Sequence, residues 1–98
     1  MDIKVNAKAH ENQDGLKEYY SLELNKRFAK YVFIKEVILK IKDIKKDGIE
    51  VSLELEVENS NKMFAKSVEE TEPKAYKSVV SKINRQIEKY KEVHYKSN

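Results

Sequence analysis

Strict alternation between Ile49 and Glu58 constrains the fold of this chain more than any other feature. Five aliphatic residues occupy every second position there, and the positions between them hold four glutamates and a serine. Successive side chains of a β-strand point to opposite faces of a sheet, so this segment predicts a strand with one apolar and one solvated face. The apolar face needs a covering layer, which a two-layer α+β fold provides.

Three further strands are predicted, although their patterns are less regular. They span residues 2–9, 34–44 and 62–69. The first alternates cleanly and ends at Ala9, which shares a face with the preceding apolar residues. The inward face of the last strand stays open at this point. One parity would bury Met63 and Ala65, and the other would bury Phe64 and Val68.

Two segments have helical periodicity. Apolar residues recur at steps of four and three over residues 16–31, after cap chemistry at Asn12 and Asp14. A second helix opens at Pro73, where the missing N–H costs nothing. Because a residue before proline resists helical dihedral angles, Glu72 is the expected cap of this helix.

The predicted order of elements is β-α-β-β-β-α. The first helix joins two strands, which we expect to be parallel neighbours. Turns at Asp47-Gly48 and at residues 59–61 make the following connections antiparallel hairpins. The expected fold is therefore α+β, a two-layer sandwich of a four-stranded mixed sheet with both helices on one face. Residues 1–98 are expected to form a single domain.

Composition excludes several functional classes. The chain has no cysteine, so it has no disulfide, thiol nucleophile or thiolate metal site. His10 and His94 do not form a cluster with metal-ligand spacing, and no phosphate-cradling glycine motif is present. We therefore expect no metal, no cofactor, no small-molecule substrate and no enzymatic activity. No segment approaches the roughly 18 apolar residues of a membrane span, so a cytoplasmic protein without membrane contact is expected.

Both predicted helices carry cations beside the apolar face. A row of fixed cations along an aromatic-bearing seam suits a phosphate backbone, and two adjacent helices could merge their rows into one groove. The alternative is a merely solvated flank, and Glu23 and Glu88, which interrupt the basic region, support this alternative. The candidate RNA-binding residues are Lys26, Arg27 and Lys30 on the first helix and Lys82, Arg85 and Lys89 on the last.

Two other groups of residues have both a functional and a simpler interpretation. Glu54, Glu56 and Glu58 could attract a cation, but residues two apart on a strand lie about 7 Å apart, so pairing with lysines of neighbouring strands is expected instead. Tyr19 and Tyr90 lie nearest the basic borders and could stack on a base. Core packing is the simpler expectation for both tyrosines.

The stretch from Met63 to Lys91, and above all K-I-N-R-Q-I-E-K-Y-K near its end, resembles the ribosome hibernation promoting factors. These proteins are also called ribosome-associated inhibitors or sigma-54 modulation proteins. The resemblance covers nearly the whole chain, including the opening M-D-I-K-V-N-A-K. It implies the same β-α-β-β-β-α fold and a partner, the small ribosomal subunit and its ribosomal RNA, with translation blocked sterically at the decoding region.

Carried over by position, the resemblance adds Lys91 to the candidate RNA-binding residues. The chain departs from the family pattern at Glu23, a position often basic in relatives, and at residues 72–77. It resembles the short form, which lacks a C-terminal dimerisation domain, and we expect the free protein to be monomeric. Two other hypotheses stay open: a protein-interaction module without RNA binding, and a small enzyme for which the sequence nominates no site.

Overall fold

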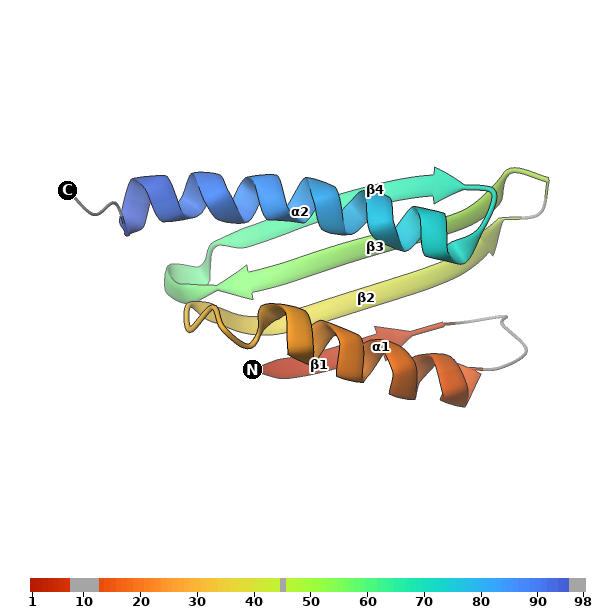
Figure 1. Ribbon diagram of the computed structural model, residues 1–98, viewed down its shortest axis with the longest axis horizontal. Helices are drawn as coiled ribbons and strands as arrows, with labels where there is room; N and C mark the ends of the chain where they lie inside the picture. Colours follow the sequence, from red (N-terminus) through yellow and green to blue (C-terminus); the bar gives the residue numbers. More distant parts are fainter. Residues whose placement is uncertain (8–12, 45, 96–98) are drawn as a thin grey trace.

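The computed structural model describes residues 1–7, 13–44 and 46–95 and confirms the predicted α+β fold (Figure 1). The sheet order is β1-β2-β3-β4, with β1 parallel to β2 and the other two pairs antiparallel. The elements are β1 (Asp2–Asn6), α1 (Gln13–Phe28), β2 (Ile34–Ile44), β3 (Gly48–Val57), a 3-10 turn η1 (Glu58–Ser60), β4 (Lys62–Glu69) and α2 (Glu72–His94).

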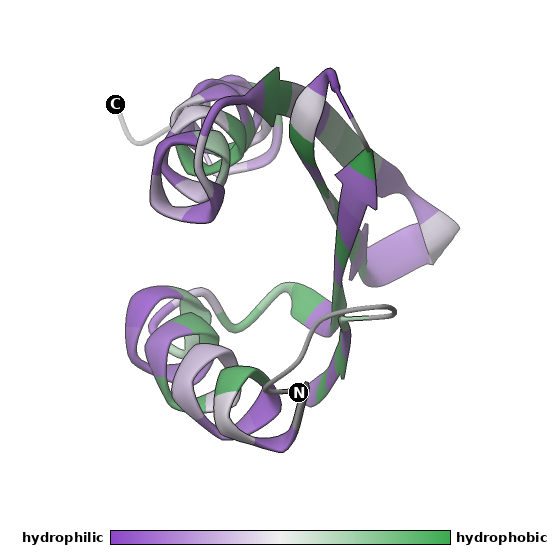
Figure 2. Cartoon of the chain, turned by 90° about the vertical axis from the view of Figure 1, so that its right-hand side faces the viewer, coloured by the Kyte–Doolittle hydropathy of each residue, from purple (hydrophilic) through white to green (hydrophobic). Residues whose placement is uncertain are grey.

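Both helices cover the same face of the sheet, and they run in the same direction (Figures 1 and 2). The inward residues of β3 are fully buried from Val51 to Val57, as the alternation predicts. On α2 the apolar positions from Ala75 to Tyr90 are buried at helical spacing. The apolar side chains of β3 and α2 bury each other, which removes apolar surface from water. This burial is the main stabilising contribution to such a core.

The structure settles which face of β4 is buried. Met63 and Ala65 point into the core, whereas Phe64 and Val68 are 55% and 43% exposed. Ala65 lies opposite Leu53 of β3 in the antiparallel register, so the two residues share the apolar face. Phe64 and Val68 therefore lie on the open face of the sheet, away from the helices.

Both predicted helix starts need correction. Asp14 lies inside the first turn of α1, and Glu72 is already helical. The α2 cap is Thr71, whose Oγ1 accepts a hydrogen bond of 3.4 Å from the Lys74 N–H. Thr71 is extended and precedes Glu72, so the helix begins one residue earlier than proline geometry alone suggests. Ala9, His10 and Asn12 lie outside the described residues.

The end of α1 also differs from its prediction. The helix stops at Phe28 rather than at residue 31, and the Tyr31 N–H donates to the Phe28 carbonyl at 3.0 Å. This tighter bond turns the chain toward β2, and Tyr31 is half-buried against the core. The position matters because Tyr31 then faces the neighbouring helix.

Candidate nucleic-acid interface

Three cations gather where α1 ends. Lys26 and Arg27 occupy the last helical turn, and Lys30 follows in the turn beyond it. The carbonyl end of a helix favours positive charge, so this placement is compatible with helix stability. Together with Glu23 these side chains line a shallow hollow of about 330 Å³. The basic border predicted on α1 therefore forms a compact cationic surface.

The row predicted on α2 faces a different neighbour. The Lys82 Nζ donates a 2.9 Å hydrogen bond to the Lys66 carbonyl on β4. Lys89 borders a second hollow beside the start of β4, and Arg85 lies on the outer side of the helix with Glu88. The expectation that this row merges with the α1 cations in one groove is therefore wrong, because the row flanks the sheet edge. Whether its residues bind RNA stays a prediction.

The opposite edge of α2 faces α1, and here a cation of α2 meets one from the turn that follows α1. The Lys30 Nζ lies 5.2 Å from the centre of the Tyr31 ring, and the Lys91 Nζ lies 5.7 Å from the same ring. Both ammonium groups are within the range of cation–π attraction. Lys91 also pairs with Glu88 at 3.5 Å, but a partly exposed pair of this kind holds a lysine only weakly. The aromatic ring thus holds two lysines from two elements at one place.

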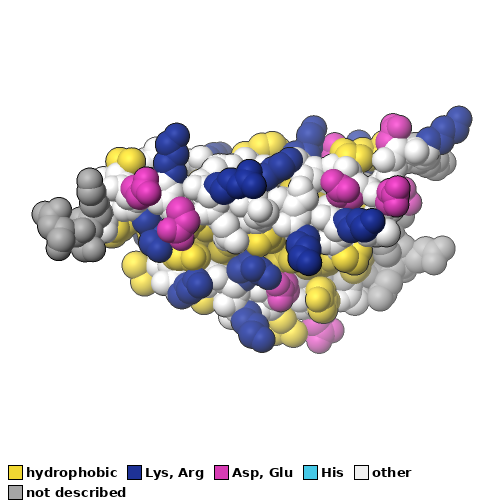
Figure 3. Space-filling model, turned by 45° about the horizontal axis from the view of Figure 1, so that its top comes forward, with side chains coloured by type: hydrophobic (Ala, Val, Ile, Leu, Met, Phe, Trp, Pro, Cys, Tyr) yellow, Lys and Arg dark blue, Asp and Glu magenta, His cyan; other side chains and the backbone are white. Residues whose placement is uncertain are grey.

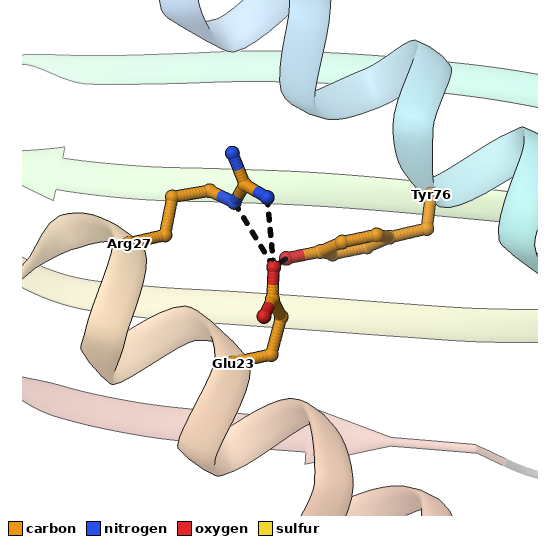
Figure 4. A network of polar contacts seen from close by, with 3 residues as sticks. All are labelled: Glu23, Arg27 and Tyr76. Carbon is orange, nitrogen blue, oxygen red and sulfur yellow. Dashed lines mark hydrogen bonds and ion pairs between the residues drawn. The ribbon is translucent and has the colours of Figure 1, made fainter.

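A polar network joins the two helices nearer the start of α2 (Figure 4). The Glu23 Oε1 accepts hydrogen bonds from Arg27 Nε at 3.2 Å and from Arg27 Nη2 at 2.8 Å. It also accepts one from the Tyr76 hydroxyl of α2 at 3.4 Å. The bond to Glu23 is the main reason that the pKa of Arg27 is raised. One cation of the α1 surface is therefore partly neutralised by its own helix.

Aromatic side chains line the space between α1 and the first turns of α2. Tyr20 and Tyr76 pack with ring centres 4.7 Å apart, and Tyr19 stands edge-on to Tyr20 at 4.9 Å. These rings border a hollow of about 540 Å³ whose lining includes Arg27 and Lys77. Tyr19 is 60% exposed and is available for stacking, contrary to the core packing expected of it.

Tyr90, the other tyrosine considered for stacking, belongs to the core. It is 9% exposed, and its hydroxyl donates to the Glu58 carboxylate at 3.1 Å. Tyr95 donates to the same carboxylate, and these bonds lower the pKa of Glu58, with the Tyr95 bond contributing most. Glu58 is thus hydrogen-bonded by tyrosines, and Lys35 of β2 acts on it only through its charge. Pairing between lysine and a β3 glutamate occurs at Lys66 and Glu50, 3.5 Å apart.

The surface view shows lysine and arginine side chains over both helices, with hydrophobic side chains exposed between them (Figure 3). A family model described as "Sigma 54 modulation protein / S30EA ribosomal protein" matches residues 3–94. The chain belongs to this family. A search of curated proteins finds no match to the chain.

The S30EA family match confirms the resemblance that the K-I-N-R-Q-I-E-K-Y-K segment indicated, and it extends over both helices and all four strands. It associates the chain with the ribosome. In this S30EA protein, Lys77 also lies beside the aromatic hollow, although it is not among the candidate residues predicted from the sequence. Lys77 precedes Lys91 by 14 positions, close to four helical turns, and this spacing could have indicated a shared face.

The described residues of this S30EA protein also form a hollow of about 370 Å³ on the open face of the sheet, whose lining from β1, β2 and β3 includes charges of both signs. Among residues 1–7, 13–44 and 46–95, no group of three or more histidine, cysteine, aspartate or glutamate side chains could hold a metal ion. None of the helices in those ranges is both long and apolar enough to cross a membrane. The basic surfaces of the two helices are therefore the candidate site that this structure offers.

Proposed function

We propose that this protein is a non-enzymatic ribosome hibernation factor that acts in the cytoplasm as a single ribosome-binding domain of residues 1–98. It binds ribosomal RNA in the decoding region of the small subunit, blocks translation sterically and stabilises inactive ribosomes. Membership of the S30EA family supports a ribosomal partner. The single observation that carries the RNA contact is the convergence of Lys30 and Lys91, from two elements, on the Tyr31 ring.

The chemistry of the convergence suits RNA. Two ammonium groups near one ring can neutralise neighbouring phosphates, and Arg27 adds a planar guanidinium that pairs with phosphate or stacks on a base. The exposed ring of Tyr19 offers a further stacking surface. With a formal net charge of only +3, binding must depend on this local arrangement rather than on total charge.

The second edge of α2 adds a further cationic surface to the proposal. Lys82 uses one hydrogen bond on the Lys66 carbonyl, and an ammonium group has three donors, so it can contact a phosphate at the same time. Arg85 and Lys89 are exposed beside it. We propose that the two edges contact RNA on either side of the α2 axis.

Co-sedimentation with ribosomes tests the proposal. The wild type should sediment with small subunits in low salt, and the Lys82→Glu/Arg85→Glu/Lys89→Glu variant should bind at least tenfold more weakly. Each charge reversal that removes one phosphate contact to single-stranded RNA should reduce the salt slope, the slope of log K against log salt concentration, by about 0.7. Equal binding by the wild type and this variant would exclude the outer edge from the interface.

A matched control distinguishes the effect of these particular cations on binding from the effect of the overall net charge. Lys40, Lys42 and Lys46 are exposed at the far end of β2 and in its turn, away from both helix edges. Reversing these three lysines to glutamate changes the net charge by the same amount and should leave ribosome binding close to that of the wild type. Loss of binding in the control as well would mean that overall charge decides, and the assignment of the interface would fail.

A further inference from the structure

The outer edge of β4 is closed by side chains of α2. Gln86 Nε2 donates to the Phe64 carbonyl at 2.7 Å, and Gln86 Oε1 accepts from the Phe64 N–H at 3.3 Å. One carboxamide therefore occupies both backbone groups of a single residue, which is the pattern that a neighbouring strand would make. Lys82 covers the next outward carbonyl, that of Lys66.

These contacts lie on the free side of the sheet. β4 is the last strand in the sheet order, and its other side is hydrogen-bonded to β3. Backbone groups of residues two apart point the same way in a strand, so the outward groups belong to Phe64, Lys66 and Val68. An open edge of this kind invites pairing with another strand, and natural proteins protect such edges by covering them.

The side chains along this edge fit a second copy of the same strand. Antiparallel pairing about a two-fold axis at Lys66 would set Phe64 opposite Val68 of the second copy, and both side chains are about half exposed in the monomer. Lys62, the first residue of β4, would come near Glu70, which directly follows the last residue of the strand, so opposite charges would meet at each end of the pairing. The one like-charge contact, Lys66 with its counterpart, is moderated because Lys66 already pairs with Glu50 at 3.5 Å.

We propose that Gln86 is the main side chain that blocks the β4 edge and keeps the chain monomeric, because it occupies two backbone groups of Phe64. Its removal opens the edge to antiparallel β4–β4 pairing with a second copy, since Lys82 makes only one solvent-exposed hydrogen bond there, which a second strand can displace. Gln86 blocks the edge through the hydrogen bonds of its carboxamide, and this role is independent of any contact with RNA. Gln86 therefore has a role separate from that of the cations on either side of it.

Sedimentation velocity over a range of protein concentrations tests whether Gln86 keeps the protein monomeric. The wild type should stay monomeric, whereas Gln86→Met, which keeps the length of the side chain but loses both hydrogen bonds, should form a dimer whose fraction rises with concentration. Adding Lys66→Pro should restore the monomer, because proline removes an outward N–H from the centre of the pairing. A monomeric Gln86→Met protein, or a dimeric wild type, would overturn the proposal.

Two controls keep the test decisive. Asn84→Met places the same apolar side chain on an exposed position of α2 and should stay monomeric. Dimerisation of both variants would show that an exposed methionine on α2 is enough to cause association, and this would contradict a specific role of Gln86 at the β4 edge. Amide hydrogen exchange on the wild type needs no variant to fold. The Phe64 amide should be protected in the monomer by its bond to Gln86, and rapid exchange there would also overturn the proposal.

Discussion

Tyr20 on α1 donates a hydrogen bond of 2.5 Å to the Glu72 carboxylate in the first turn of α2. With the contact between Tyr76 and Glu23, it gives two crossed tyrosine–carboxylate links, each helix supplying one tyrosine and one glutamate. The helices lie on different strands of the sheet, so these links fix their spacing directly. The distance between the basic surfaces of the two helices therefore depends on them.

Removing the Tyr20 hydroxyl should destabilise the fold. Tyr20 is 2% exposed, and Tyr20→Phe would take a charge-assisted hydrogen bond from Glu72. We expect the free energy of unfolding to fall by roughly 1.5–3 kcal/mol, the usual range for hydrogen bonds to charged groups. Urea denaturation measures this change. Tyr19→Phe, on the exposed neighbouring ring, should change stability by less than about 0.5 kcal/mol. An equal loss in both variants would contradict a stabilising hydrogen bond between Tyr20 and Glu72.

Alkaline pH should destabilise the protein through the same tyrosines. Burial is the largest cause, and the neighbouring Glu23 the next, of a rise in the pKa of Tyr76 from 10.0 to about 12. The pKa of Tyr20 is raised as well, mainly by burial and then by its bond to Glu72. A raised pKa in the folded state favours the protonated hydroxyl, so its contribution is complete below pH 10 and is lost as the pH rises toward 12.

Thermal unfolding across this alkaline range measures the loss, and tyrosinate absorbance follows the ionisation itself. Tyr76→Phe should flatten the pH dependence of stability between about pH 10 and pH 12. An identical slope in wild type and variant would show that Tyr76 is not responsible.

Glu23 should restrain RNA binding. Its carboxylate holds both donors of Arg27 that face it, and Glu23→Gln keeps the shape while removing the charge. We expect tighter ribosome binding by a few fold, with a salt slope increased by about 0.7 if Arg27 then reaches one more phosphate. Salt-dependent binding assays measure both quantities. Glu18→Gln makes the same charge change on an exposed position of α1, and an equal gain there would exclude a specific effect of Glu23.

The two edges of α2 should contribute unequally. Lys30→Glu/Lys91→Glu removes two cations that meet at Tyr31, whereas Lys82→Glu/Lys89→Glu removes two from the β4 side. Both variants change the net charge equally. We expect the first to weaken ribosome binding more, because its two ammonium groups lie 5.2 and 5.7 Å from the same ring and so present their charges together. The opposite order in a titration with small subunits would place the main contact at the outer edge.

Gly48 should tolerate no side chain. Its φ is +114°, and a Cβ atom there would lie 2.2 Å from the Glu69 carbonyl oxygen. Gly48→Ala should therefore lower the free energy of unfolding by more than the roughly 1–2 kcal/mol of backbone strain alone. Asn59→Gly is the comparison, since Asn59 has a φ of 64° that glycine adopts freely, and it should be nearly neutral in the same urea titration. A neutral Gly48→Ala would show that the turn rearranges.

Sequence alone was sufficient for the order of the elements and for the apolar faces of β3 and α2. Alternation in β3 and helical spacing in α2 depend on backbone periodicity, which is local, and the structure buries the residues that these patterns select. The turn expected at Asp47-Gly48 is likewise a local property, and Gly48 there has a positive φ. The cap of α2 was misplaced by one residue, since the choice between Thr71 and Glu72 depended on a single hydrogen bond.

Only the tertiary structure decided what each edge of a helix faces. Periodicity places Lys82 and Lys91 on opposite flanks of the α2 apolar face, but it cannot say which flank adjoins α1 and which adjoins β4. That choice follows from the strand order and from the packing of both helices on one face of the sheet. The burial of Met63 rather than Phe64 was decided in the same way, by the register of β4 against β3.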